Sequence, residues 1–141
     1  MKMEKIEVDI KVPNQTRYLS LIGKIGEGLA MTLERYKGDR EELAYHLNLV
    51  LTEAMTNAIR HANEDDPGKE LHITISIMEK TLKILVYDEG QGFDINSLPS
   101  PDFKNLDEHG RGVYIIRTLM DQVVYRKEGK GHVLIMEKKF H

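Results

Sequence analysis

Hydrophobic and polar residues alternate along the start of the chain. A spacing of two places side chains on one face of a strand, and the apolar positions here are Ile6, Val8, Ile10 and Val12. Pro13 follows directly, and proline disfavours a continuing strand because it has no N–H to donate to a neighbour. The pattern predicts a half-buried first strand.

Helical periodicity follows in two segments. In residues 16–36, apolar residues recur every three or four positions, as on one face of a helix, although three glycines weaken its middle. A second helix is predicted from about residue 40 to about residue 62, where an apolar stripe has the same spacing. Its members are Leu43, Leu47, Val50, Leu51, Ala54 and Ala58.

The middle of the chain predicts a hairpin and then an irregular loop. Residues 71–77 and 82–86 alternate in polarity, which is typical of two paired strands, and they place Asp88 at a strand end. Residues 93–109 hold prolines, serines and asparagines with little periodicity. Loops of this length are often lids over functional sites.

A helix over residues 112–121 and a second hairpin, of residues 123–125 and 132–136, complete the pattern. The order is strand, two helices, two strands, loop, helix, two strands. We therefore expect an α/β fold of the α+β kind, a two-layer sandwich. Its sheet should be mixed but mainly antiparallel, with three helices covering one face.

Composition narrows the class of protein. The 141 residues fit a single domain spanning residues 1–141. Twenty Lys+Arg against 23 Asp+Glu give a net charge of −3 without a basic block, which argues against nucleic-acid binding. There is no cysteine, so disulfides and thiolate metal sites are excluded. No apolar run approaches the ~20 residues of a membrane helix, and no signal peptide is evident. We expect a cytoplasmic protein with no membrane partner.

Asp88, Gly90, Gly92 and Phe93 form a compact motif directly after a predicted strand. A carboxylate at a strand end, beside flexible glycines, is able to hold a flat polar ligand. Taken alone, the same residues are equally typical of an acidic turn. They are therefore candidates for ligand binding that need support from other segments.

Glu53, Asn57 and His61 lie four positions apart in the second predicted helix. Residues at that spacing lie along one line of an α-helix. A carboxylate and a carboxamide one turn apart suit acid–base chemistry and metal binding. A solvated helix face explains the same pattern when it is taken alone.

Gly110, Arg111, Gly112 and Val113 lie where the irregular loop leads into the last predicted helix. The open N–H groups and the dipole at a helix start favour an anion such as phosphate. A tight turn before a helix explains the same Gly-x-Gly sequence.

Together and in this order, the three motifs resemble the ATP-binding motifs of the GHKL superfamily, which includes gyrase and histidine kinases. The resemblance extends over residues 49–136 and is strongest to the bacterial anti-sigma-factor serine/threonine kinases, whose asparagine motif is similar to residues 51–62 here. It implies the Bergerat-type ATP fold, with ATP and Mg²⁺ as cofactors.

The resemblance also implies roles for single residues. Asp88 would accept a hydrogen bond from the exocyclic amine of adenine, where a 6-keto purine presents an acceptor instead. Asn57 resembles the Mg²⁺ ligand. Glu53 resembles the general base that takes a proton from a serine or threonine hydroxyl. Gly110 and Gly112 match the second glycine motif, whose N–H groups face the phosphates.

Some residues match less well. His61 and Arg111 are candidates for supporting phosphate charge, and each is also explained as an ordinary residue near a helix end. Glu108 stands where some family members carry a basic residue, which puts that γ-phosphate contact in doubt. Residues 132–134 offer no hydroxyl where many members have a threonine that supports the adenine aspartate. We therefore expect looser base recognition.

The function implied is that of an ATP- and Mg²⁺-dependent serine/threonine kinase that acts as an anti-sigma factor. It would phosphorylate a STAS-domain anti-anti-sigma protein and bind a sigma factor. Two alternatives stay open: an ATP-gated binding module without kinase activity, and a histidine-kinase-like ATPase that acts in trans. Family members commonly form homodimers, so a homodimer is a further expectation.

Overall fold

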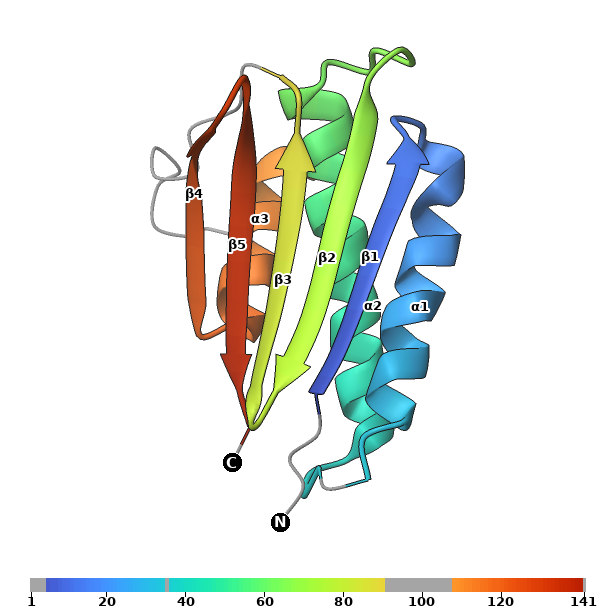
Figure 1. Cartoon of the computed structure of the whole chain (residues 1–141), viewed down its shortest axis with the longest axis vertical. Coiled ribbons are helices and arrows are strands. Elements are labelled where there is room, and N and C mark those ends of the chain that lie inside the picture. The colour runs from blue at the N-terminus through green and yellow to red at the C-terminus, as the bar shows by residue number, and fades with distance from the viewer. Residues whose placement is uncertain (1–4, 35, 91–107, 141) are drawn as a thin grey trace.

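Helices cover one face of a five-stranded sheet in the computed structural model of the chain (Figure 1). The structure describes residues 5–34, 36–90 and 108–140. Within these ranges the elements are β1 (Lys5–Pro13), the 3₁₀ turn η1 (Thr16–Tyr18), α1 (Leu19–Met31), α2 (Arg40–Asn57), the π-helical segment η2 (Ala58–Ala62), β2 (Glu70–Met78), β3 (Thr81–Asp88), α3 (Glu108–Leu119), β4 (Gln122–Glu128) and β5 (Gly131–Lys139).

The strand order in the sheet is β1-β2-β3-β5-β4. All four strand pairs among the described residues are antiparallel. The predicted order of elements and the two-layer α/β sandwich are confirmed, while the parallel component that a mixed sheet allows is not found within these ranges. In the part of the chain that the structure describes, the helices are too short or too polar to span a bilayer.

Helix α2 begins at Arg40, as predicted. The side chain of Asp39 accepts hydrogen bonds from the N–H groups of Glu41 and Glu42, over 2.9 and 3.3 Å. An aspartate in this position satisfies donors that have no partner within the helix. The local sequence therefore fixes where the helix starts.

Helix α1 is shorter than predicted, because it ends at Met31 and not at Tyr36. The N–H groups of Thr32 and Leu33 bond carbonyl oxygens three residues earlier, and the Thr32 hydroxyl donates to the carbonyl oxygen of Leu29 over 2.7 Å. Bonds of this kind tighten the last turn and end the helix. The apolar periodicity continues beyond that point, which is why it overestimates the length.

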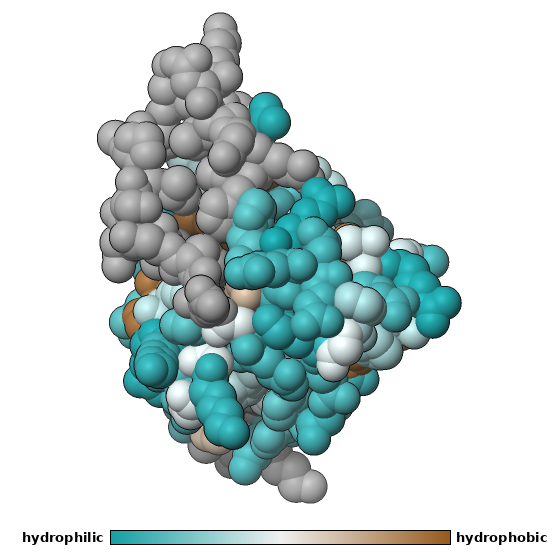
Figure 2. Space-filling view, turned by 90° about the horizontal axis from the view of Figure 1, so that it is seen from above, coloured by the Kyte–Doolittle hydropathy of each residue, from teal (hydrophilic) through white to brown (hydrophobic). Residues whose placement is uncertain are grey.

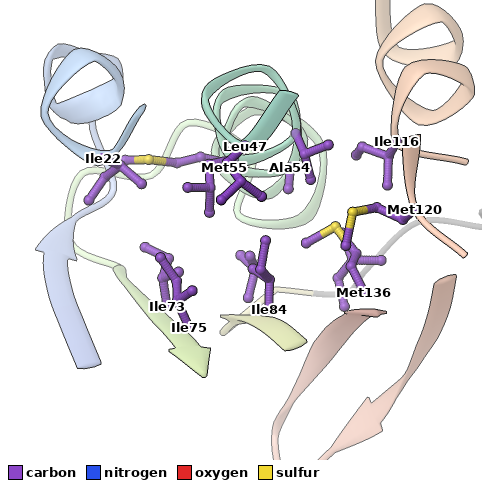
Figure 3. Close-up of a cluster of buried hydrophobic side chains, with 14 of the residues drawn as sticks. Ile22, Leu47, Ala54, Met55, Ile73, Ile75, Ile84, Ile116, Met120 and Met136 are labelled. Atoms are coloured by element: carbon purple, nitrogen blue, oxygen red, sulfur yellow. The ribbon is translucent and has the colours of Figure 1, made fainter. Parts of the chain in front are cut away.

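The core lies between the helices and the sheet (Figure 3). Ile22 and Met55 of the helices and Ile75 and Ile84 of the strands are each at most 1% exposed. Burial of one such side chain stabilises the fold by about 1.5 to 3 kcal/mol. The methionines predicted to lie in the core are confirmed there: Met55, Met120 and Met136.

Two glycines of α1 have different surroundings. A methyl carbon added at Gly26 would lie 2.5 Å from Cδ1 of Leu51 and 3.4 Å from Cβ of Leu47, both on α2. Nothing lies within 4 Å of one added at Gly28. The first glycine therefore allows α1 to pack closely on α2, and the second has no packing role.

The variant Gly26→Ala should lower the free energy of unfolding by about 1 to 3 kcal/mol, because Leu51 would have to leave its packed position. The matched control Gly28→Ala should leave it unchanged or raise it by up to about 1 kcal/mol, since alanine is the better helix former. Urea unfolding followed by circular dichroism measures both. Equal effects would contradict the packing of α1 on α2.

Candidate functional site

The end of β3 lies against the end of the second helical run. The N–H of Glu89 donates to Oδ1 of Asn63 over 2.9 Å. Gly90 lies so close to η2 that a methyl group there would overlap the carbonyl oxygen of Ala62. Only glycine fits at such an approach of two backbones. The strand end that carries Asp88 is thereby held beside the helical run that carries Asn57.

Asn63 is buried, with 0% of its surface exposed, and both ends of its carboxamide are hydrogen-bonded. Its Nδ2 donates to Oδ1 of Asn14 over 2.9 Å, while its Oδ1 accepts from Glu89. Asn14 in turn donates to the carbonyl oxygen of Asp66 over 3.0 Å. A satisfied polar network in a low dielectric rigidifies its members. It ties together the end of β1, the turn after η2 and the end of β3.

Asp88 is the last residue of β3 and is only 6% exposed. Its Oδ1 accepts a hydrogen bond from the N–H of Gly90 over 3.0 Å, and its Oδ2 accepts one from the Tyr125 hydroxyl over 2.8 Å. Burial raises the pKa of Asp88. The hydrogen bonds from Tyr125 and Gly90, and nearby His132, oppose that rise. The carboxylate is thus buried but supported.

Helices α2 and α3 meet at Gly112. A methyl carbon added there would lie 2.5 Å from Oε2 of Glu53 and 3.6 Å from Oδ1 and Nδ2 of Asn57. Glu53 is half-buried and Asn57 is 2% exposed. Because glycine has no side chain, α3 approaches the carboxylate and the carboxamide directly. The structure therefore brings these three predicted site residues together.

His61 does not continue the line of Glu53 and Asn57. It lies in η2 and its side chain is exposed, whereas Asn57 is buried at the end of α2. A π-helical turn is wider than an α-helical one, so residues four apart no longer stack. The expectation of one line holds for the first two residues only. Gly92 and Phe93 lie outside the described residues.

Helix α3 begins at Glu108, four residues before its predicted start. A glycine costs only about 1 kcal/mol in a helix, so the glycine motif is tolerated within the first turns. The N–H groups without a helical partner are those of the first four residues. Gly110 and Arg111 are therefore among them, while Gly112 and Val113 lie further in. Arg111 is exposed, and the Val113 side chain belongs to the core.

Tyr125 and His132 lie beside Asp88 and were missed by sequence reasoning. Residues 132–134 do lack a hydroxyl, but a hydroxyl reaches Asp88 from the next strand, β4. The alternation of Val123 and Tyr125 with polar residues indicates which face they share. The cross-strand register that brings Tyr125 to Asp88 has no such signal.

The described surface at this end of the molecule is mostly hydrophilic (Figure 2). An open hollow of about 530 Å³ lies beside the end of β3. Its lining includes three lysines and one glutamate, so the local potential is positive. The lining residues are Lys69, Glu89, Gly90, Lys127, Lys130 and His132.

These groups fit an adenine nucleotide with Mg²⁺. Asp88 retains acceptor positions, since each carboxylate oxygen has two lone pairs. The buried amide oxygen of Asn57 is of the kind that Mg²⁺ binds, and the start of α3 provides N–H groups suited to phosphate. Space for such a ligand beside Asn57 is kept by Gly112, where a side chain would meet Glu53. Glu53 is able to accept a proton.

An α/β sandwich with a strand-end carboxylate and an asparagine-bearing helix beside a glycine-containing helix start defines a class of nucleotide-binding ATPase domains. The chain belongs to the histidine kinase-like ATPase domain family, whose family model matches residues 18–138. ATP is thus the class of ligand to which the fold is suited.

Curated relatives share most of the chain's length. The chain is 32% identical over 131 residues to the serine-protein kinase RsbW of Bacillus subtilis (strain 168), covering 87% of this chain and 79% of that protein. It is 31% identical over 145 residues to the protein of the same name from Bacillus thuringiensis (strain Al Hakam), covering 96% and 87%.

Among solved structures, the fold is similar to the histidine kinase domain of the Erythrobacter litoralis EL346 blue-light activated histidine kinase. The TM-score is 0.55 and the sequence identity 20%, over 92% of this chain and 62% of that one. This match shows the Bergerat-type arrangement of helices and sheet.

The raised pKa of Asp88 should make stability depend on pH. Below its ordinary value of 3.8 the carboxyl is protonated in both states. As the pH rises from 3.8 towards the raised pKa, the unfolded chain loses its proton first, so stability falls. The unfolding free energy of the wild type, relative to Asp88→Asn, should decrease between about pH 3 and pH 7. Urea unfolding at a series of pH values checks this, and a constant difference would refute it.

Asn63→Ala should lower the unfolding free energy by about 2 to 4 kcal/mol, because it leaves the Glu89 N–H and the Asn14 carboxamide oxygen buried without that partner. The N–H of Glu89 should also exchange faster with deuterium. Urea unfolding and hydrogen exchange measure the two effects. A loss of stability without faster exchange at Glu89 would argue against the link between Asn63 and β3.

Proposed function

We propose that the protein is an ATP- and Mg²⁺-dependent serine/threonine kinase that acts as an anti-sigma factor in a partner-switching pathway. It phosphorylates a STAS-domain anti-anti-sigma protein and binds a sigma factor in the cytoplasm, as a homodimer. One observation carries the proposal: similarity to the serine-protein kinase RsbW over 87% of this chain and 79% of that protein.

Glu53 is the proposed general base. It takes the proton from the substrate hydroxyl as the oxygen attacks the γ-phosphorus of ATP, and ADP leaves. Its half-buried carboxylate adjoins both Asn57 and Gly112, so it lies at the junction of the two helices that would hold the phosphates. A base must be fixed beside the nucleophile, and a helix is a rigid support for it.

Asn57 is the proposed Mg²⁺ ligand, through its amide oxygen. The bound ion supplies countercharge for the phosphate oxygens. Gly110 and Arg111 contribute N–H groups from the first turn of α3, and Gly112 and Val113 extend that turn. His61 and the exposed Arg111 side chain are proposed to support phosphate charge at the periphery.

Asp88 is the proposed adenine ligand, accepting a hydrogen bond from the exocyclic amine. Gly90 fixes the backbone directly after it, by its approach to Ala62. Gly92 and Phe93 complete the proposed adenine-binding motif. A carboxylate that accepts and never donates favours adenine over a 6-keto purine.

Glu53→Gln should lower phosphate transfer about 100-fold to 10,000-fold, because glutamine cannot take the proton. Affinity for ATP should stay within about threefold, since the side chain keeps its size. Purified protein, labelled ATP and the STAS-domain proteins of the same genome test transfer, and calorimetry tests binding. Glu42→Gln, exposed on the same helix, is the matched control and should change neither.

Asn57→Ala should abolish the Mg²⁺ dependence of ATP binding in the same calorimetry. Wild-type protein that binds ATP but transfers no phosphate to any STAS protein would remove the kinase proposal and leave an ATP-gated binding module. Folded wild-type protein that binds no ATP would remove both. Transfer to a histidine phosphoacceptor alone would support a histidine-kinase-like ATPase acting in trans.

A further inference from the structure

Tyr125 and His132 form a stacked pair beside Asp88. Their ring centroids are 5.2 Å apart and the rings are nearly parallel, at 10°. His132 pairs with Asp88 across β5 and β3, and Tyr125 pairs with Leu134, two residues along β5. Because side chains alternate along a strand, all three rings and carboxylate share the helix-facing side of the sheet.

The carboxylate of Asp88 is held by one donor on each oxygen. The Tyr125 hydroxyl donates to Oδ2 over 2.8 Å, and the N–H of Gly90 donates to Oδ1 over 3.0 Å. The last torsion of an aspartate is otherwise broad, so its carboxylate turns easily. Two donors on opposite oxygens fix the plane of the carboxylate and leave its other lone pairs available.

His132 holds the tyrosine ring in this position. Besides the stack, its Nδ1 lies 3.2 Å from the carbonyl oxygen of Gly90 and 3.8 Å from Oδ1 of Asp88. The ring is therefore fixed between Tyr125 and the backbone that follows Asp88. Tyr125, His132 and Gly90 form one support around a single carboxylate.

We propose that Tyr125 is a positioning residue that sets the preference for adenine. The inference rests on the proposed function, in which Asp88 accepts the exocyclic amine of the base. A carboxylate already held in one orientation loses no rotational freedom when the amine binds, so binding gains from preorganisation. Guanine presents an acceptor at the same place and is repelled by the fixed carboxylate.

Tyr125→Phe removes the hydroxyl and keeps the ring that stacks on His132. Tyr87 offers a matched control, because it precedes Asp88 in β3 and faces the other side of the sheet. Its ring stacks on His72, with centroids 5.0 Å apart. Tyr87→Phe thus removes the same atom, from a similar stack, without touching the carboxylate.

The test is calorimetry of the whole chain with Mg²⁺ and two nucleotides, ATP and purine riboside triphosphate, which lacks the 6-amine. Tyr125→Phe should raise the Kd for ATP about tenfold, as loss of a hydrogen bond to a charged group does. The Kd for purine riboside triphosphate should stay within about twofold, and the ratio of GTP to ATP affinity should rise. Tyr87→Phe should change none of these.

Equal weakening of both nucleotides by Tyr125→Phe, or no weakening of either, would overturn the inference. So would loss of folding in this variant, checked by thermal melting, because the role would then be structural. In an Asp88→Asn background, Tyr125→Phe should no longer alter ATP affinity. Wild-type protein that binds neither nucleotide would instead overturn the proposed function, so the two failures are distinguishable.

Discussion

The contact between the end of β3 and the end of η2 sets the geometry on which the candidate site depends. Gly90 lies against the carbonyl oxygen of Ala62, and Asn63 accepts from the next backbone N–H along β3. Both links are backbone-based and buried, so they leave little room for relative movement. The sheet layer and the helix layer are therefore registered at the point where Asp88 and Asn57 face the same region.

Burying a carboxylate at that junction opposes folding unless donors compensate. Three groups do so around Asp88: the Tyr125 hydroxyl, the Gly90 N–H and nearby His132. A leucine at this place would continue the apolar row of Val86 and Ile84 more favourably. A chain that retains a supported carboxylate here is using stability for recognition, as functional sites commonly do.

Much of the fold follows from local patterns. Alternation and periodicity predict the order of strands and helices, and motif spacing predicts that Glu53 and Asn57 lie together. Three features were not predictable in this way. The contact of Tyr125 with Asp88 depends on the register of two strand pairs, η2 depends on tertiary contacts at the helix end, and α3 starts before its glycines because local propensity differences there are small.

The π-helical segment has a consequence for how the chain tolerates length changes. The N–H of Asn63 reaches back five residues, to the carbonyl oxygen of Ala58, over 2.8 Å. Deleting one residue between them would restore an ordinary α-helix and swing every later side chain by about 100° about the axis. Asn63 would then turn away from β3. Substitutions in η2 are therefore tolerable where a single-residue deletion is not.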